Sequence, residues 1–212
     1  KRKVILIHDK FFSLKNKDNE QFISFVEIIK KLCESVNLIG IPGGDKTKNF
    51  SQLENVLEES LSFNIDRSSL IIAFGGGVIG DIAGFAASIL LRGIDFVQIP
   101  TTLLAQVDSS VGGKTGINSS KSKNLIGSFH QPIAVIADIG MLKTLPKREF
   151  LAGLVEVIKY GLIYDLKFFN NLENNYKDIL NYDQLKLNEI ISKSCEIKSL
   201  IIKNDEKENG KR

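Results

Sequence analysis

Short apolar runs alternate with segments of helical periodicity through roughly the first two thirds of this 212-residue chain. The clearest helical segments are Asn19–Val36 and Ile79–Leu91, and the pattern Ser51-Gln52-Leu53-Glu54 predicts a capping box that opens another helix. Strands that alternate with helices are joined by right-handed crossovers, so this order predicts an α/β domain with a parallel sheet. The predicted strands are Val4–Ile7, Leu38–Ile41, Leu70–Phe74, Phe96–Ile99 and Ile133–Ala137.

The pattern changes near Leu142. From Pro146 onward we find only helical periodicity, in the segments Arg148–Ile163, Leu166–Ile179 and Gln184–Ile202. The simplest organisation is a parallel-sheet α/β domain over residues 1–143, followed by the start of an all-helical domain over residues 144–212.

The composition narrows the class of protein. A net charge of +3, without a basic stripe interleaved with aromatic residues, argues against nucleic-acid binding. The longest apolar run, Ile82–Leu91, is about half of the ~20 residues that a membrane span needs, and Val4–Ile7 is too short for a signal peptide. We therefore expect a cytoplasmic protein without a membrane partner. Its two cysteines, Cys33 and Cys195, are expected to be free thiols.

A glycine-rich turn lies between the third predicted strand and the next helix. Gly75, Gly77 and Gly80 satisfy the pattern G-x-G-x-x-G, in which backbone amides and a helix N-terminus approach a pyrophosphate. The alternative is a tight turn without a ligand. The next strand ends in Pro100-Thr101-Thr102, where the usual Rossmann fold has an acid, so the sequence indicates a dinucleotide bound in an unusual way.

Two further loops carry charged residues beside glycines. Asp108–Thr115 ends like an ATP-binding P-loop, but that motif needs glycine where Asp108 stands, and a carboxylate there would repel phosphate. The second loop, Pro42–Lys48, follows a predicted strand, where Asp45 could accept from a ribose or adenine donor and Lys48 could balance phosphate charge. An ordinary polar turn remains the alternative for this second loop.

The first helix after Pro146 contains Glu156 and Lys159, three residues apart. Such pairs are usually solvated surface partners, although small neighbours on the same face also suit a lined cleft. With only His8 and His130 in the chain, the residues present cannot complete a histidine-based metal site.

Taken together, these segments resemble the 3-dehydroquinate synthase family of sugar phosphate cyclases. The resemblance rests on GGGVIGD at Gly75–Asp81, PTTLLAQVDSSVGGKTGIN at Pro100–Asn118, KNLIGSFHQP at Lys123–Pro132, LKTLPKRE at Leu142–Glu149 and GLVEVIKYG at Gly153–Gly161. It implies an NAD-binding Rossmann-like domain and a helical metal- and substrate-binding domain. The implied activity is a lyase of the shikimate pathway that makes 3-dehydroquinate from 3-deoxy-D-arabino-heptulosonate 7-phosphate (DAHP), on the way to chorismate and the aromatic amino acids.

The resemblance also implies roles for single residues. The NAD pyrophosphate would lie against Gly76, Gly77, Val78, Ile79, Gly80 and Asp81. The adenosine half would meet Gly44, Asp45 and Lys48. The ribose and nicotinamide would meet Thr101, Thr102, Leu142, Lys143 and Thr144.

For the substrate, the resemblance implies a set of charged and amide side chains. Asp108, Lys114 and Lys123 would line the nicotinamide and substrate, while the carboxylate, hydroxyls and phosphate of DAHP would meet Asn124, Lys159, Lys198 and Arg212. Arg92 resembles a phosphate ligand that a neighbouring subunit contributes, which implies a homodimer. Glu156 resembles the carboxylate ligand of a catalytic zinc or cobalt ion.

The chain also departs from the family pattern. Asp45 stands where the family usually has the longer Glu, and the two histidine metal ligands of the family would lie beyond Arg212. We therefore expect a fragment that is inactive alone. The alternatives are a deoxy-inosose or valiolone synthase, a metal-dependent glycerol or alcohol dehydrogenase, or a nucleotide-binding module without catalysis.

Overall fold

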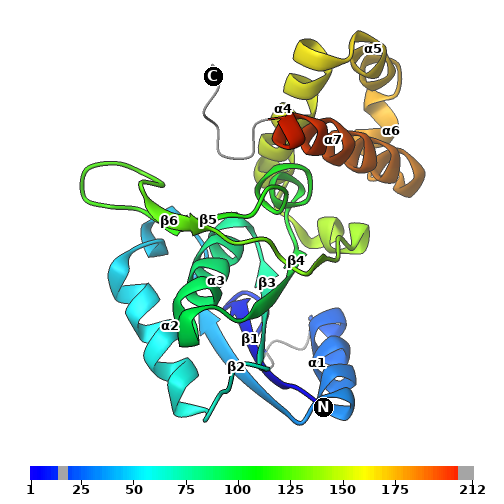
Figure 1. The fold of residues 1–212 in the computed structure, drawn as a ribbon. Coiled ribbons are helices and arrows are strands. Elements are labelled where there is room, and N and C mark those ends of the chain that lie inside the picture. The colour runs from blue at the N-terminus through cyan, green and yellow to red at the C-terminus, as the bar shows by residue number, and fades with distance from the viewer. Residues whose placement is uncertain (14–18, 205–212) are drawn as a thin grey trace. The chain divides into compact units, whose positions relative to one another are not determined.

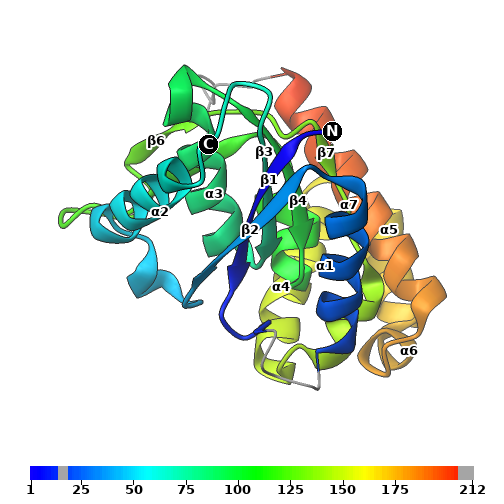
Figure 2. The same ribbon diagram turned by 90° about the horizontal axis from the view of Figure 1, so that it is seen from below.

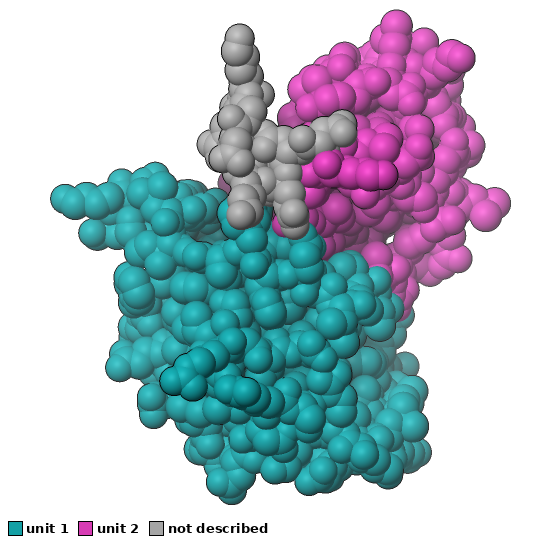
Figure 3. All heavy atoms as spheres, in the orientation of Figure 1, with its two compact units in different colours: residues 1–99, 113–136 teal, residues 100–112, 137–212 magenta. Residues whose placement is uncertain are grey.

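The computed structural model describes residues 1–13 and 19–204, and it divides into two compact units. The first unit comprises Lys1–Ile99 and Gly113–Ile136; the second comprises Pro100–Gly112 and Ala137–Arg212 (Figure 3). The chain thus passes between the units three times. The segment Pro100–Gly112 groups with the helices because the fully buried side chains of Leu103 and Val107 belong to the second unit's core. A domain boundary after residue 143 stays a prediction.

The first unit is built on a five-stranded sheet with the order β2-β1-β3-β4-β7. Strand β1 lies parallel to both β2 and β3, so that Ile5 stands between Asn37 and Ile71, and β4 lies parallel to β7. This confirms the predicted α/β class and parallel sheet. The strands are β1 (Lys3–Asp9), β2 (Ser35–Ile41), β3 (Leu70–Gly75), β4 (Asp95–Pro100) and β7 (Ala134–Val135).

Helices cover both faces of this sheet (Figures 1 and 2). On one face, α2 (Phe50–Ser62) and α3 (Gly77–Ile89) bury Val56 and Ile82 in a core shared with strand residues. On the other face, α1 (Glu20–Leu32) places Phe22 against Phe74, with ring centroids 5.0 Å apart. Alternate strand residues point to opposite faces, which is why one strand serves both cores.

The start of α2 differs from the prediction. The helix begins at Phe50, and its N-cap is Asn49, whose side chain accepts a hydrogen bond from the Gln52 N–H. The predicted capping box at Ser51 was wrong. Asn49 is an equally favourable N-cap residue, and because it lies two residues earlier the helix already includes Ser51.

A two-stranded antiparallel hairpin was not predicted. It joins β5 (Lys114–Ile117) to β6 (Ile126–Phe129), with Gly116 opposite Gly127. A Cβ atom at Gly116 would lie 2.3 Å from the Ile126 oxygen, and one at Gly127 would lie 1.9 Å from the Thr115 oxygen. Glycine is therefore required at both positions. These glycines also disguise the strands, since glycine is depleted in typical strand sequences.

The second unit is helical in the described residues after Ala137, as predicted. Its helices are α4 (Lys147–Tyr164), α5 (Leu166–Asn174), α6 (Tyr176–Leu180) and α7 (Gln184–Asn204). The predicted single helix Leu166–Ile179 is two helices, because the backbone leaves helical geometry at Asn175. Short helical turns complete the chain: η1 (Asp45–Thr47) and η2 (Leu90–Arg92) in the first unit, and η3 (Ala105–Ser109, a π-helical turn) and η4 (Ile139–Thr144) in the second. No helix within residues 1–13 and 19–204 is long and apolar enough to span a bilayer.

Candidate functional site

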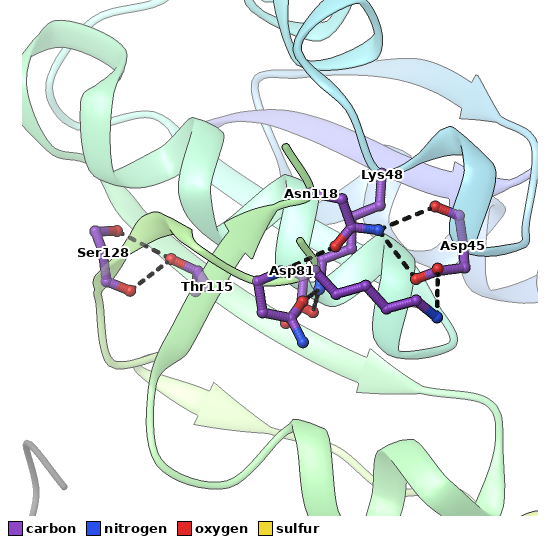
Figure 4. A network of polar contacts seen from close by, with 8 residues as sticks. Asp45, Lys48, Asp81, Thr115, Asn118 and Ser128 are labelled. Atoms are coloured by element: carbon purple, nitrogen blue, oxygen red, sulfur yellow. Dashed lines mark hydrogen bonds and ion pairs between the residues drawn. The ribbon is translucent and has the colours of Figure 1, made fainter. Parts of the chain in front are cut away.

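A network of polar side chains in the first unit joins the loop after β2, the start of α3 and the loop between β5 and β6 (Figure 4). At its centre is Lys48, in the loop after β2, with a side chain only 6% exposed. Its ammonium group forms an ion pair with Asp81, in the first turns of α3, and donates a hydrogen bond to Asn124 Oδ1, in the loop between β5 and β6. The structure thus brings these three predicted ligand-binding residues together.

Asp45 forms the outer part of the same network. Lys123 Nζ lies 2.8 Å from Asp45 Oδ2, and Asn118 Nδ2 donates to Asp45 Oδ1 over 3.2 Å. The hydrogen bond from Lys123, followed by that from Asn118, lowers the pKa of the Asp45 carboxyl, which is therefore ionised at neutral pH. Asn118 was not predicted as a site residue.

The glycine-rich turn lies at the N-terminus of α3. Gly75 ends β3, and Gly76 is the N-cap of α3, with no side chain capping the helix. Ile79 is buried in the core, so it can offer a ligand only its backbone. The uncapped N–H groups of a helix N-terminus bind anions, and the turn is followed directly by the Asp81–Lys48 pair. Backbone amides, a lysine and an ionised Asp45 fit the pyrophosphate and ribose of a dinucleotide.

Asp108 and Lys198 form a second charged cluster, in the second unit. Lys198 Nζ, on α7, lies 2.5 Å from Asp108 Oδ1 and 2.6 Å from the Asp108 backbone oxygen. The Tyr160 hydroxyl, on α4, donates to the same carboxylate over 2.8 Å. The structure confirms none of the predicted roles here, but it places two predicted residues in direct contact. Tyr160 was not predicted as a site residue, and its only signal was its place on the helical face next to Lys159.

Burial and charge compete in this cluster. Burial pushes the pKa of Asp108 upward, but the charge of Lys198 and the hydrogen bonds from Lys198 and Tyr160 outweigh burial and hold the pKa below its usual value. Burial, with the nearby negative charge of Asp108, raises the pKa of Tyr160 far above the usual value for tyrosine. At neutral pH the cluster is therefore an ionised carboxylate between an ammonium group and a neutral phenol.

Glu156 and Lys159 form an ion pair on α4. The ion pair involves Glu156 Oε2, an enclosed atom that accepts no hydrogen bond beyond its contact with Lys159, and the Glu156 side chain is 25% exposed. The pair is thus less solvated than a usual surface pair, which was one of the two interpretations that the sequence allowed. Within the part of the chain that the structure describes, no three His, Cys, Asp or Glu side chains gather closely enough to hold a metal ion. The described residues therefore do not form a complete metal centre. Glu156 stays a predicted ligand that would need partners from outside these residues.

The remaining predicted cofactor residues of the second unit differ in what they can offer. Thr102 Oγ1 accepts from the Ala105 N–H, and Thr144 Oγ1 donates to the Met141 oxygen. Thr101 is buried and Lys143 is exposed. The Leu142 side chain packs in the core, so this residue can meet a ligand only through its backbone.

Three further predicted residues lie elsewhere. Lys114 begins β5 and is exposed. Arg92 is exposed just after α3 and has a left-handed backbone, with φ of 67°, as does Leu91 with φ of 51°. Arg212 lies outside the described residues.

Comparison with known proteins adds independent information. The family model described as "3-dehydroquinate synthase N-terminal" matches residues 38–152, and the one described as "3-dehydroquinate synthase C-terminal" matches residues 153–212. A 3-dehydroquinate synthase of Prochlorococcus marinus is 53% identical over 191 residues, covering 89% of this chain and 52% of that protein. One of Alkaliphilus metalliredigens is 55% identical over 169 residues, covering 80% of this chain and 48% of that protein.

Solved structures show the same fold. A crystal structure of 2-deoxy-scyllo-inosose synthase complexed with carbaglucose-6-phosphate, NAD⁺ and Co²⁺ superposes with a TM-score of 0.85 at 29% sequence identity. The match covers 99% of this chain and 56% of that one. The chain spans about half the length of the curated relatives it matches.

Proposed function

Because the chain belongs to the 3-dehydroquinate synthase family, we propose that the protein containing it converts DAHP to 3-dehydroquinate and phosphate. This places it in the shikimate pathway, as a carbon–oxygen lyase that uses NAD⁺ without net oxidation. The observation that carries the proposal is the Lys48–Asp81–Asn124 network beside the glycine turn of α3, which supports a dinucleotide site in the first unit.

NAD⁺, when bound, would supply reversible hydride transfer at a substrate hydroxyl. The residues of this chain are proposed to bind and orient the cofactor and the substrate. Gly76 to Ile79 offer backbone N–H groups to the pyrophosphate, while the Gly80 N–H already donates to the Gly76 backbone oxygen. Ionised Asp45 accepts from the adenosine ribose, and Gly44, with φ of 93°, lets the loop turn there. Thr101, Thr102 and the 142–144 turn are proposed neighbours of the ribose and nicotinamide.

The substrate is an acidic sugar phosphate, and several cations of the chain suit it. Lys114, Lys123, Lys159 and Lys198 would bind its carboxylate and phosphate as charge-assisted donors, with Asn124 on a hydroxyl. Asp108, ionised and neutralised by Lys198, would accept a hydrogen bond at the reacting end of the substrate. Arg92 is proposed to reach the phosphate of a second copy in a homodimer. A zinc or cobalt ion would bind Glu156 together with ligands that the described residues do not hold.

The test uses the full translated product of the gene, incubated with DAHP, a catalytic amount of NAD⁺ and Zn²⁺ or Co²⁺. Phosphate release without accumulation of NADH is the expected result. Accumulation of NADH in step with turnover would favour the dehydrogenase alternative.

A related cyclase is the second candidate, since an inosose synthase shares the fold at 29% identity. The 53% identity to a 3-dehydroquinate synthase favours DAHP. Preferential turnover of a hexose 6-phosphate over DAHP would reverse that choice.

A further inference from the structure

Asn118, directly after β5, holds together the two ligand-binding loops of the first unit. Its backbone N–H donates to the Lys48 oxygen over 2.8 Å. Its side-chain Nδ2 donates to the Asp45 backbone oxygen over 3.3 Å and to the carboxylate Oδ1 of Asp45 over 3.2 Å. Its Oδ1 accepts from the Asn124 N–H over 3.0 Å. Every partner of Asn118 in these bonds is thus a residue with a proposed role in binding.

The contacts of Asn118 require a side-chain amide. It must donate toward the Asp45 carboxylate and accept from the Asn124 N–H, and an aspartate has no donor for the first contact. Asn124 itself has a left-handed backbone, with φ of 57°, so its conformation depends on support from its surroundings. That support comes from Asn118 on its N–H and from Lys48 on its side chain.

We propose that Asn118 is a positioning residue, which fixes the loop over residues 44–48 to the loop over residues 118–124. It holds the Asp45 carboxylate and the Asn124 amide in place before a ligand arrives. The inference rests on the proposed binding of NAD⁺ in the first unit. A site organised in advance binds more tightly because less ordering is needed on binding.

The first test is Asn118→Ala in this chain, with two measurements. Without ligand, amide hydrogen exchange of Asn124 should become faster, because its N–H loses Asn118 Oδ1 as acceptor. With NAD⁺, calorimetry should show a dissociation constant about tenfold higher, the equivalent of roughly one charge-assisted hydrogen bond. The matched control is Ser119→Ala, because among the described residues the Ser119 side chain bonds within its own loop, to Ser122 and Lys121. It should leave NAD⁺ binding unchanged.

The second test is Asn118→Asp, which places a second carboxylate against Asp45. The cations that face Asp45 are Lys123, at 2.8 Å, and Lys48. Two close carboxylates raise the pKa of one of them, so at lower pH they share a proton and a donor is restored. NAD⁺ affinity should therefore fall more at pH 8 than at pH 5.5, relative to wild type at each pH. A residue that only stabilised the fold would give the same loss at both.

The outcomes separate the two ideas. If the wild type does not bind NAD⁺, the proposed function of the first unit fails, and hydrogen exchange still decides whether Asn118 fixes the loop. Unchanged exchange in Asn118→Ala would overturn the inference. Faster exchange with unchanged NAD⁺ affinity would also overturn it, because the loops would then be joined without serving the ligand.

Discussion

The two charged clusters differ in how completely the chain satisfies its own polar groups. In the first unit, hydrogen bonds and ion pairs connect polar residues of three segments: Asp45, Lys48, Asp81, Asn118 and Asn124. In the second unit, Asp108 has its partners and Glu156 has its ion pair with Lys159, but some enclosed polar atoms accept no hydrogen bond. Among the described residues, the enclosed side-chain atoms without a hydrogen bond are Gln106 Oε1, Ser110 Oγ and Glu156 Oε2, all in the second unit.

Unsatisfied buried polar atoms cost free energy, so proteins keep them mainly where water, an ion or a ligand completes them. The difference therefore indicates that the polar groups of the first unit's network satisfy one another without a ligand. In the second unit, Gln106 Oε1 and Ser110 Oγ have no such partner among the described residues.

The largest expected effect is that of Lys198→Met. It leaves the Asp108 carboxylate partly buried without its cation, and we expect a loss of about 3 kcal/mol in the free energy of unfolding. Urea denaturation measures it. The control is Lys193→Met on the same helix, whose ion pairs with Asp165 and Glu196 are more exposed and should contribute less than about 1 kcal/mol. Equal losses in both variants would show that the Asp108 cluster is no more than a surface pair.

Lys48→Met should cost about 2 kcal/mol, because it removes one buried cation from Asp81 and Asn124. Adding Asp81→Asn should recover part of that loss, since the side chain that has lost Lys48 is then neutral. A double-mutant cycle by chemical denaturation measures the coupling. If Lys48→Met costs more than Lys198→Met, the first unit depends more on its ion pair than the comparison implies.

Low pH should reduce the contribution of the Asp108 cluster to the free energy of unfolding. The folded-state pKa of Asp108 is lowered, so its stabilising contribution is full above the unfolded pKa of about 3.9 and is lost as the pH falls through the folded pKa. The difference in unfolding free energy between wild type and Asp108→Asn should thus be constant above about pH 5 and shrink below about pH 4. The same series with Asp45→Asn should change less, because Asp45 is half exposed. A larger change for Asp45 would contradict this order.

The smallest effect on stability is expected for Lys123→Ala. Its ion pair with Asp45 is exposed on both sides, so the free energy of unfolding should change by less than about 0.5 kcal/mol. The pKa of Asp45, followed by NMR titration of its carboxyl carbon, should nevertheless rise toward its usual value, because Lys123 is the largest cause of its lowering. An unchanged pKa would mean that Asn118 alone holds Asp45.

The sequence predicted those parts of the fold that depend on local patterns. Apolar alternation gave the parallel sheet, and the glycines before α3 marked a strand-to-helix turn. The hairpin of β5 and β6 was missed, because its strands have four residues each and carry the facing glycines Gly116 and Gly127. Close approach of two backbones is a tertiary requirement, and periodicity does not report it.

The sequence named candidate site residues one by one, and their roles stay predictions, but it did not predict the contacts between them. Lys48 was named for a phosphate and Asp81 for the pyrophosphate, yet the two are paired with each other across 33 positions of sequence. Asn118 and Tyr160 had no signal of their own, since an asparagine after a strand and a tyrosine on a helix are ordinary residues. Their importance arises only from the partners that folding brings to them.

The threefold passage of the chain between its units bears on the order of synthesis. Leu103 and Val107 emerge from the ribosome before α4 and α7, which complete the core in which they are buried. The core of the first unit is also completed late in synthesis, because Ile117 and Ile126 join it only after the segment Pro100–Gly112 has been made. A ribosome stalled within α4 would therefore hold a nascent chain whose Leu103 and Val107 side chains are still uncovered.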